Sequence, residues 1–148
     1  MLRQVLIGAL ASTAMMVSTS AFAQGTALEA RAMLEKAVAA VKADKAKAIA
    51  SFDAGTDGFK DRDLYPFCFN LSDGINVAGP LPVRGKDVRT IKDAAGKAFG
   101  EDLYKAAQDG KVNEVTYSFP KPGATEPSPK VSFVTKAGDL GCGVGYYK

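Results

Sequence analysis

The segment that follows residue 25 carries a helical pattern of apolar residues. Over residues 26–52, apolar side chains recur on one stripe at the spacing of a helix, and most of the lysines lie off that stripe. The stripe consists of Leu34, Val38, Val41, Ala48 and Phe52. The alanines, lysines, glutamates and leucines of this segment are also good helix formers. We therefore predict one long amphipathic helix, which Gly55 and Gly58 end.

Two apolar runs joined by turn residues come next. Residues 64–71 and 75–78 are typical of strands, and the first run is apolar at both alternating sets of positions. The Ser-Asp-Gly at residues 72–74 favours a tight turn, because glycine tolerates positive φ and aspartate bonds its own backbone. Pro80 and Pro82 end the second strand, since proline cannot donate to a strand ladder. The pattern predicts a hairpin whose first strand is central and covered on both faces.

The next segment, residues 83–108, is predicted to be mostly helical and irregular at its start. Phe99, Leu103 and Ala106 form its apolar side, and Gly110 is a plausible stop. Asp93 is expected to cap the better-formed part, because an aspartate side chain accepts from the free amides at a helix start. This segment then connects the hairpin to the rest of the chain.

Three more strands are predicted at residues 112–119, 130–136 and 141–147, with a proline-rich loop between the first two. Glycines at 141, 143 and 145 leave one face of the last strand nearly without side chains, which often marks close approach of another backbone or a ligand. The order of elements predicts an α+β domain. It has a five-stranded antiparallel sheet, with the N-terminal helix on one face and the helical connector over the other.

Residues 1–23 have the pattern of a secretory signal peptide. Arg3 precedes an apolar run at residues 5–17, and the Ala-Phe-Ala that ends at Ala23 matches a cleavage site. The alternative is a membrane anchor, but that run is shorter than the roughly 20 apolar residues that span a bilayer. We predict cleavage after Ala23 and a single soluble domain over residues 24–148, exported to the periplasm or secreted.

Charge and composition exclude several function classes. Lys and Arg total 19 and Asp and Glu 16, so the chain without Arg3 carries 18 basic and 16 acidic groups, a net +2. That charge is too mild to favour nucleic-acid binding. The absence of histidine excludes His-based triads and His metal sites, and two cysteines cannot form a Cys₄ site. We expect no enzyme activity, no metal and no cofactor.

Five motifs in order then suggest a family. They are DLYPFCFNLSDG, VRGKDVRTIKDAAGKAF, VTYSFPKPG, PKVSFV and GCGVGYY. Over residues 26–148 the chain resembles the single Cache domain of type 2, an extracytoplasmic relative of the PAS fold. The resemblance implies a long helix behind a central antiparallel sheet and a small pocket on the other face. It also implies a sensor of small organic molecules, often short carboxylates, in signal transduction by chemoreceptors or histidine kinases. The chain has no kinase or methyl-accepting region, so we expect a free-standing form.

Three basic residues are candidates for binding a carboxylate. Lys130 opens the PKVSFV strand at the recurrent lysine position of the family, although an exposed edge lysine is the alternative. Arg84 and Arg89 lie in the connector that would cover the pocket, and arginine offers a two-pronged donor to carboxylates. Either arginine could instead be a surface charge.

The other candidates are polar groups that could orient a ligand. Tyr65 and Tyr117 would offer hydroxyl groups, as a buried tyrosine normally satisfies its hydroxyl, and core packing is the alternative. Tyr104 and Tyr146 are weaker candidates of the same kind. Asp93, with Gly96, matches an Asp-x-x-Gly position of the family, for which capping and chain geometry are the simpler interpretation.

Cys68 and Cys142 are a disulfide candidate. Export implies an oxidising compartment, and the first and last strands of a PAS-like sheet are neighbours. Adjacent strands often hold the wrong geometry for a bridge, however, so two free buried thiols remain the alternative.

These observations favour a non-catalytic sensor that binds a small organic ligand, such as a carboxylate of two to four carbons, and is read by a membrane-bound kinase or chemoreceptor. The alternative is an interaction or dimerisation module of a signalling system, with no ligand in its pocket and a homodimer formed through the long helix.

Overall fold

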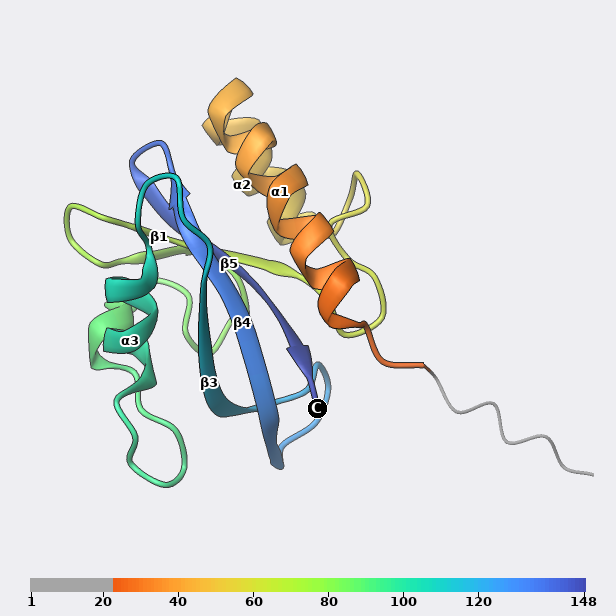
Figure 1. Cartoon of the computed structure of the whole chain (residues 1–148), viewed down its shortest axis with the longest axis vertical. Coiled ribbons are helices and arrows are strands. Elements are labelled where there is room, and N and C mark those ends of the chain that lie inside the picture. The colour runs from red at the N-terminus through yellow and green to blue at the C-terminus, as the bar shows by residue number, and fades with distance from the viewer. Residues whose placement is uncertain (1–22) are drawn as a thin grey trace, which may run out of the picture.

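A five-stranded antiparallel sheet is the frame of the fold, with helices on both of its faces (Figure 1). The computed structural model describes residues 23–148, so the predicted signal peptide lies outside the described residues except for Ala23. The strand order is β2-β1-β5-β4-β3. The strands are β1 (Pro66–Asn70), β2 (Asn76–Ala78), β3 (Asn113–Pro120), β4 (Pro127–Ala137) and β5 (Leu140–Tyr147). The predicted α+β class and sheet are confirmed, and β1 is an interior strand.

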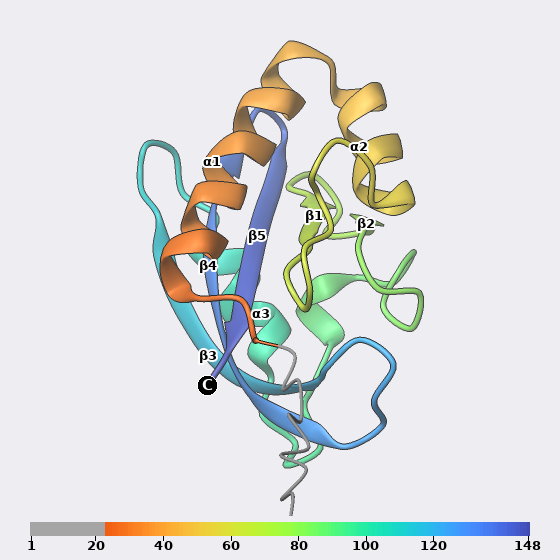
Figure 2. The same cartoon turned by 90° about the vertical axis from the view of Figure 1, so that its right-hand side faces the viewer.

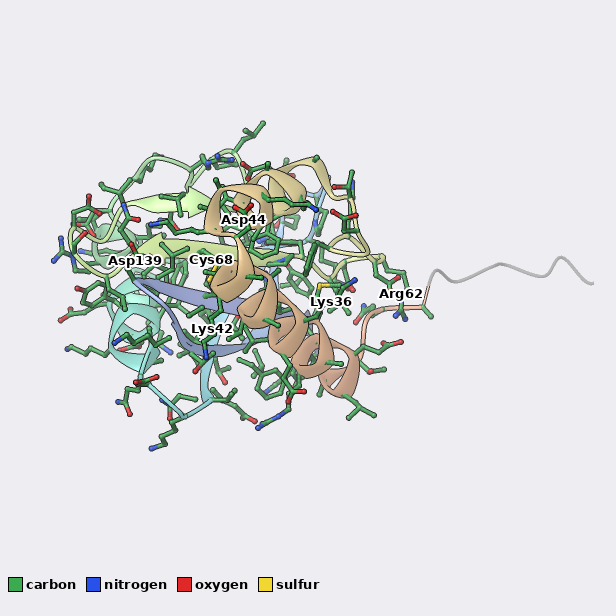
Figure 3. All side chains as sticks on the ribbon, turned by 90° about the horizontal axis from the view of Figure 1, so that it is seen from above. Lys36, Lys42, Asp44, Arg62, Cys68 and Asp139 are labelled. Carbon is green, nitrogen blue, oxygen red and sulfur yellow. A yellow bond between two sulfur atoms is a disulfide. The ribbon has the colours of Figure 1, made fainter. Side chains whose placement is uncertain are left out.

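The helical segment on one face differs from the prediction, because it is two helices and not one. Helix α1 (Ala27–Ala43) ends at Asp44, whose φ of −158° and ψ of 98° are extended. The Asp44 carboxylate accepts a hydrogen bond from the Lys47 amide and so starts α2 (Lys45–Ala54). Seen from above, Asp44 lies at the corner between the two helices (Figure 3). A short polar side chain that bonds nearby amides competes with helical hydrogen bonding, which an apolar stripe does not reveal.

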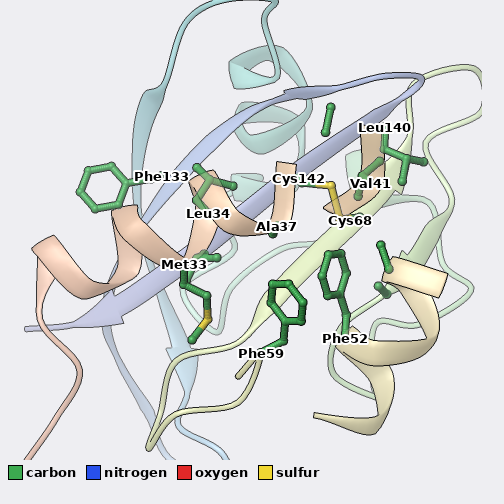
Figure 4. Close-up of a cluster of buried hydrophobic side chains, with 14 of the residues drawn as sticks. Met33, Leu34, Ala37, Val41, Phe52, Phe59, Cys68, Phe133, Leu140 and Cys142 are labelled. Carbon is green, nitrogen blue, oxygen red and sulfur yellow. A yellow bond between two sulfur atoms is a disulfide. The ribbon is translucent and has the colours of Figure 1, made fainter. Parts of the chain in front are cut away.

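Side chains from both α1 and α2 pack into the core between these helices and the sheet (Figure 4). Its fully buried members are Ala30, Leu34, Ala37, Cys68, Ala78, Ala137, Leu140, Cys142 and Val144. The break at Asp44 turns α2 back, and Phe52 then meets Phe59 edge to face with ring centroids 4.6 Å apart. Cys68 and Cys142 are directly opposite in the β1–β5 ladder and form a disulfide in this core.

The connector on the other face is less helical than predicted. It consists of turns, one short 3₁₀ helix, η1 (Val88–Thr90), and α3 (Phe99–Ala106). The predicted cap at Asp93 is wrong, since α3 begins after Ala98 without a side-chain cap. The Asp93 carboxylate instead accepts from the amides of Ala95 and Lys97 in a turn that Gly96 completes at φ +83°.

The glycines of β5 admit large side chains from neighbouring strands onto the connector-facing side of the sheet. A Cβ at Gly141 or Gly143 would meet the rings of Phe69 or Phe67, and one at Gly145 would lie 2.4 Å from Cε of Lys130. The predicted close approach therefore exists, and its nearest atoms belong to side chains. These rings join a second core, which also contains Val88, Phe99, Leu103, Val115, Tyr117 and Val134.

Candidate functional site

A small cavity lies between the sheet and the connector. Its lining is Tyr65, Phe67, Asn76, Pro80, Val83, Val88, Ile91, Phe99, Leu103, Tyr117, Phe119 and Lys130. The free volume is about 30 Å³, which is room for roughly two water molecules. The wall is mainly apolar, with Lys130, Asn76 and two tyrosines as its polar groups. A mainly apolar pocket with a few aimed polar groups is the usual form of a small-molecule site.

Strand register brings Lys130 to this wall. Lys130 lies opposite Tyr117 of β3 on one side and opposite Tyr147 of β5 on the other. Since side chains directly opposite in neighbouring strands project on the same face, these three form a row across the sheet. The alternation along β4 places Ser132 next on that face, where its hydroxyl lies 2.8 Å from the Tyr117 hydroxyl. A stacked contact with Phe99, with centroids 4.3 Å apart, further orients the Tyr117 ring.

The ammonium of Lys130 is buried among aromatic rings. The residue is 1% exposed, and its Nζ donates a hydrogen bond to the Tyr65 hydroxyl at 2.9 Å. Nζ also lies 4.4 Å from the ring centroid of Tyr65 and 5.0 Å from that of Tyr147. Among residues 23–148, Lys130 forms no salt bridge with any carboxylate.

Burial changes the proton affinities of the groups around Lys130. Desolvation lowers the pKa of Lys130 to about 7, and the charge of Asp63 offsets only part of this effect. Desolvation raises the pKa of Tyr65 and that of Tyr117, and it raises the pKa of Tyr147 to about 12. The three phenols therefore stay protonated and can act as donors, whereas the lysine is close to losing its charge near neutral pH.

The structure brings three of the predicted site residues together at the cavity, namely Lys130, Tyr65 and Tyr117. Tyr104, Arg84, Arg89 and Asp93 do not line it. The Tyr104 hydroxyl donates to the Leu71 carbonyl.

The two predicted arginines form ion pairs near the surface. Arg84 pairs with Asp53 of α2. Arg89 pairs with Asp87 at 2.6 Å and covers the Tyr104 ring. Their placement gives no support to a role in binding a ligand inside the cavity.

Sequence reasoning missed three polar residues at or beside the cavity, Asn76, Ser132 and Tyr147. A signal existed for Tyr147, because strand alternation places it on the same face as the β5 glycines. Tyr146 faces the helices instead and stacks on Phe133. No comparable signal existed for Asn76, which reaches the wall from the edge strand while its amide donates to the Lys86 carbonyl at 2.9 Å.

Residues 23–148 contain no cluster of three or more potential metal-ligating side chains. In the same part of the chain, no helix has the length and apolar character needed to cross a membrane.

The sequence profile of the single Cache domain 2 family matches residues 10–147. The chain belongs to this family. The predicted family is thereby confirmed, and Cache domains supply the fold-level comparison for the cavity described above. A search of curated proteins finds no match to this chain.

Several solved structures share the fold. A methyl-accepting chemotaxis protein from Vibrio parahaemolyticus RIMD 2210633 has 26% identity and a TM-score of 0.65, over 81% of this chain and 86% of that one. A periplasmic sensor domain of a chemotaxis protein has 24% identity and a TM-score of 0.58, over 79% and 86%. A Cache chemosensory domain that recognises carboxylic acid has 23% identity and a TM-score of 0.56, over 78% and 84%.

Proposed function

We propose that this Cache domain is an exported, non-catalytic sensor that binds a small organic carboxylate against Lys130. Three facts support the proposal: the family, the chemotaxis proteins among its structural neighbours, and a neighbour that recognises carboxylic acid. The periplasm is the compartment that suits a sensor domain of this kind, as one neighbour is itself periplasmic. A membrane-bound chemoreceptor or kinase would read the bound state.

The buried ammonium without an anionic partner is the observation that carries this proposal. Burying an unpaired charge costs several kcal/mol, and proteins normally place a counter-charge beside it. A ligand carboxylate would supply that charge and hold Lys130 protonated. The hydroxyl of Tyr65, whose pKa is raised by burial, would remain available as a second donor. The buried ammonium supports an anionic ligand group at this wall, and the Tyr65 hydroxyl would help to orient that group.

The small volume suggests how binding would produce a signal. A cavity of about 30 Å³ admits a carboxylate group only with some movement of the connector, because a free cavity of that size holds roughly two waters. A ligand that binds a more open arrangement better than this one shifts the population toward it. The connector would be the element that moves, since it is built from turns and two short helices.

Calorimetry on the purified chain with acetate, propionate, pyruvate and succinate tests the proposal. Lys130→Met removes the charge while keeping an unbranched apolar side chain, and we expect at least a tenfold loss of affinity for every acid that binds. Lys136→Met, on the same strand but outside the cavity lining, should bind as the wild type does. Equal affinities of wild type and Lys130→Met would reject the proposal.

The same small volume favours a second candidate, an interaction module with no ligand. Leu28 on α1 is 79% exposed, and this helix would then pair with a second copy or a partner. A mass that doubles with concentration in sedimentation equilibrium, together with no heat from any acid, would support this candidate over the first.

A further inference from the structure

A second, larger hollow adjoins the cavity on the outside of the molecule. It has a volume of about 630 Å³ and is bounded by four chain segments. These are the end of α2, the segment that leads into β1, the turn after β2 and the turn after β3 (Figure 2). We call it the outer groove. Its volume falls within the range of roughly 300–1,000 Å³ that is typical of small-molecule sites.

The outer groove and the inner cavity share part of their lining. Tyr65, Pro80 and Phe119 line both. Tyr65 is the residue that accepts the hydrogen bond from Lys130. Pro80 begins a turn in which the amides of Val83 and Arg84 both donate to the Pro80 carbonyl. Two of these three shared residues are aromatic, and the third begins a turn whose next residue, Leu81, is 85% exposed.

The groove combines an apolar floor with a basic rim. The floor includes Phe52, Phe59, Leu64, Pro66 and Phe119. The charged residues of its lining are Asp53, Lys60, Arg62, Arg84 and Lys121, four cations and one anion, which gives a net +3. Arg62 and Arg84 are already paired with carboxylates, whereas Lys60 and Lys121 form no salt bridge within residues 23–148. A basic rim attracts anions toward the groove, and an apolar floor favours an apolar body.

We propose that the outer groove is the tail subsite of the Lys130 site, so that the ligand class is a monocarboxylate with an apolar chain or ring. The carboxylate lies against Lys130 and the apolar body lies in the groove, past Tyr65, Pro80 and Phe119. The inner cavity, at about 30 Å³, admits a carboxylate group only when the connector moves and is too small for a longer acid, whereas the groove of about 630 Å³ has room for the apolar body. This inference rests on the proposed function, because it takes Lys130 as the anion-binding group.

A chain-length series tests the tail subsite. Straight-chain acids from acetate to octanoate are titrated into the purified chain by calorimetry, below their micelle concentrations. We expect affinity to rise about fourfold for each added methylene, which is the gain from burying one CH₂ group. Lys130→Met should weaken the binding of acetate and octanoate by a similar factor of at least ten, because both would lose the same charge contact.

Two matched variants locate the subsite. Ala54→Trp fills the groove from the end of α2, and it should leave acetate affinity unchanged while removing the gain with chain length. Ala46→Trp makes the same change on an exposed position of the same helix outside the groove and should behave as the wild type. Ala124→Trp repeats the block from the turn after β3 if Ala54→Trp misfolds.

The outcomes separate the two proposals. Acetate binding that depends on Lys130 but does not strengthen with chain length overturns the tail subsite and leaves the proposed function standing. The tail subsite is also overturned if affinity still rises with chain length in Ala54→Trp and Ala124→Trp, because the apolar chain of the ligand would then lie elsewhere. Binding of any acid that is indifferent to Lys130→Met overturns the proposed function itself.

Discussion

Lys130 shows how strongly its surroundings change the chemistry of one side chain. In water its ammonium would keep its proton to beyond pH 10, but here desolvation lowers the pKa to about 7. Three aromatic rings and one phenol hydroxyl surround it, and none of them carries a negative charge at neutral pH. The residue therefore destabilises the unliganded fold when it is charged, which is the usual cost of a binding site that awaits a counter-charge.

That cost predicts a specific dependence of stability on pH. The folded-state pKa of Lys130, about 7, lies below its unfolded value of 10.5. Between these two values the unfolded chain binds one more proton than the folded chain. The destabilisation caused by Lys130 therefore shrinks as pH rises toward 10.5 and grows as pH falls toward 7. Lys130→Met should be more stable than wild type at pH 7, and the gap should shrink by up to about 1.4 kcal/mol per pH unit on going to pH 9.

Urea unfolding of both proteins at pH 7, 8 and 9 measures this gap. Subtracting the variant removes the contribution of every other titrating group, and stopping at pH 9 avoids ionising the tyrosines of the unfolded chain. A gap that is the same at all three pH values would show that Lys130 is not desolvated as described.

At the scale of elements, the turn after β2 is attached to α2 by the Arg84–Asp53 ion pair. The sequence resemblance places Arg84 in the connector and predicts a ligand-binding role, but the ion pair gives it a different task. It holds one wall of the outer groove against the end of a helix on the opposite face of the sheet. The alternation of apolar residues does not predict this ion pair, because alternation indicates which face a residue occupies and not which distant element lies beside it.

The two roles of Arg84 predict different results. If it acts as a tether, Arg84→Gln and Asp53→Asn should both speed amide hydrogen exchange over residues 81–86, by similar factors of about two to five. Acetate affinity should then change less than twofold in either variant. A tenfold loss of affinity in Arg84→Gln alone would instead restore the predicted role as a ligand residue.

At the scale of the whole molecule, the sheet separates two cores of different composition. The helix-facing core holds the disulfide and the largest set of buried aliphatic residues, whereas the connector-facing core holds the aromatic rings and the cavity. The disulfide and the cavity therefore lie on different faces of the same strands. The disulfide joins residues 74 apart in sequence, so it removes much freedom from the unfolded chain.

Removing the bridge should separate these two properties. Exchanging both cysteines for alanine is expected to lower the free energy of unfolding by roughly 4 kcal/mol, as the loop-closure relation gives for a loop of this length. Because the bridge faces the helices, the variant that remains folded at 15 °C should keep its acetate affinity within about threefold. Urea unfolding and calorimetry measure the two quantities, and a large loss of affinity in a folded variant would show that the cores are coupled.

The sequence by itself determined the elements that depend on local patterns. Apolar runs and alternation identified the five strands, and turn residues placed the hairpin. Gly55 ended the helical segment, and the ordered motifs identified the family and pointed to Lys130. The sequence pattern did not predict the break at Asp44 or the weak helicity of the connector. Single side-chain hydrogen bonds decide both features, and such bonds do not change the spacing of apolar residues.

Only the tertiary structure decided which distant residues meet. The pairing of β1 with β5 brought Cys68 to Cys142, and the β3–β4–β5 register set Tyr117, Lys130 and Tyr147 in one row. Packing also turned Arg84 and Arg89 toward surface acids and left Lys130 without one. The physical reason is that burial and charge pairing are properties of surroundings assembled from the whole chain, whereas a sequence pattern reports the intrinsic preference of each short segment.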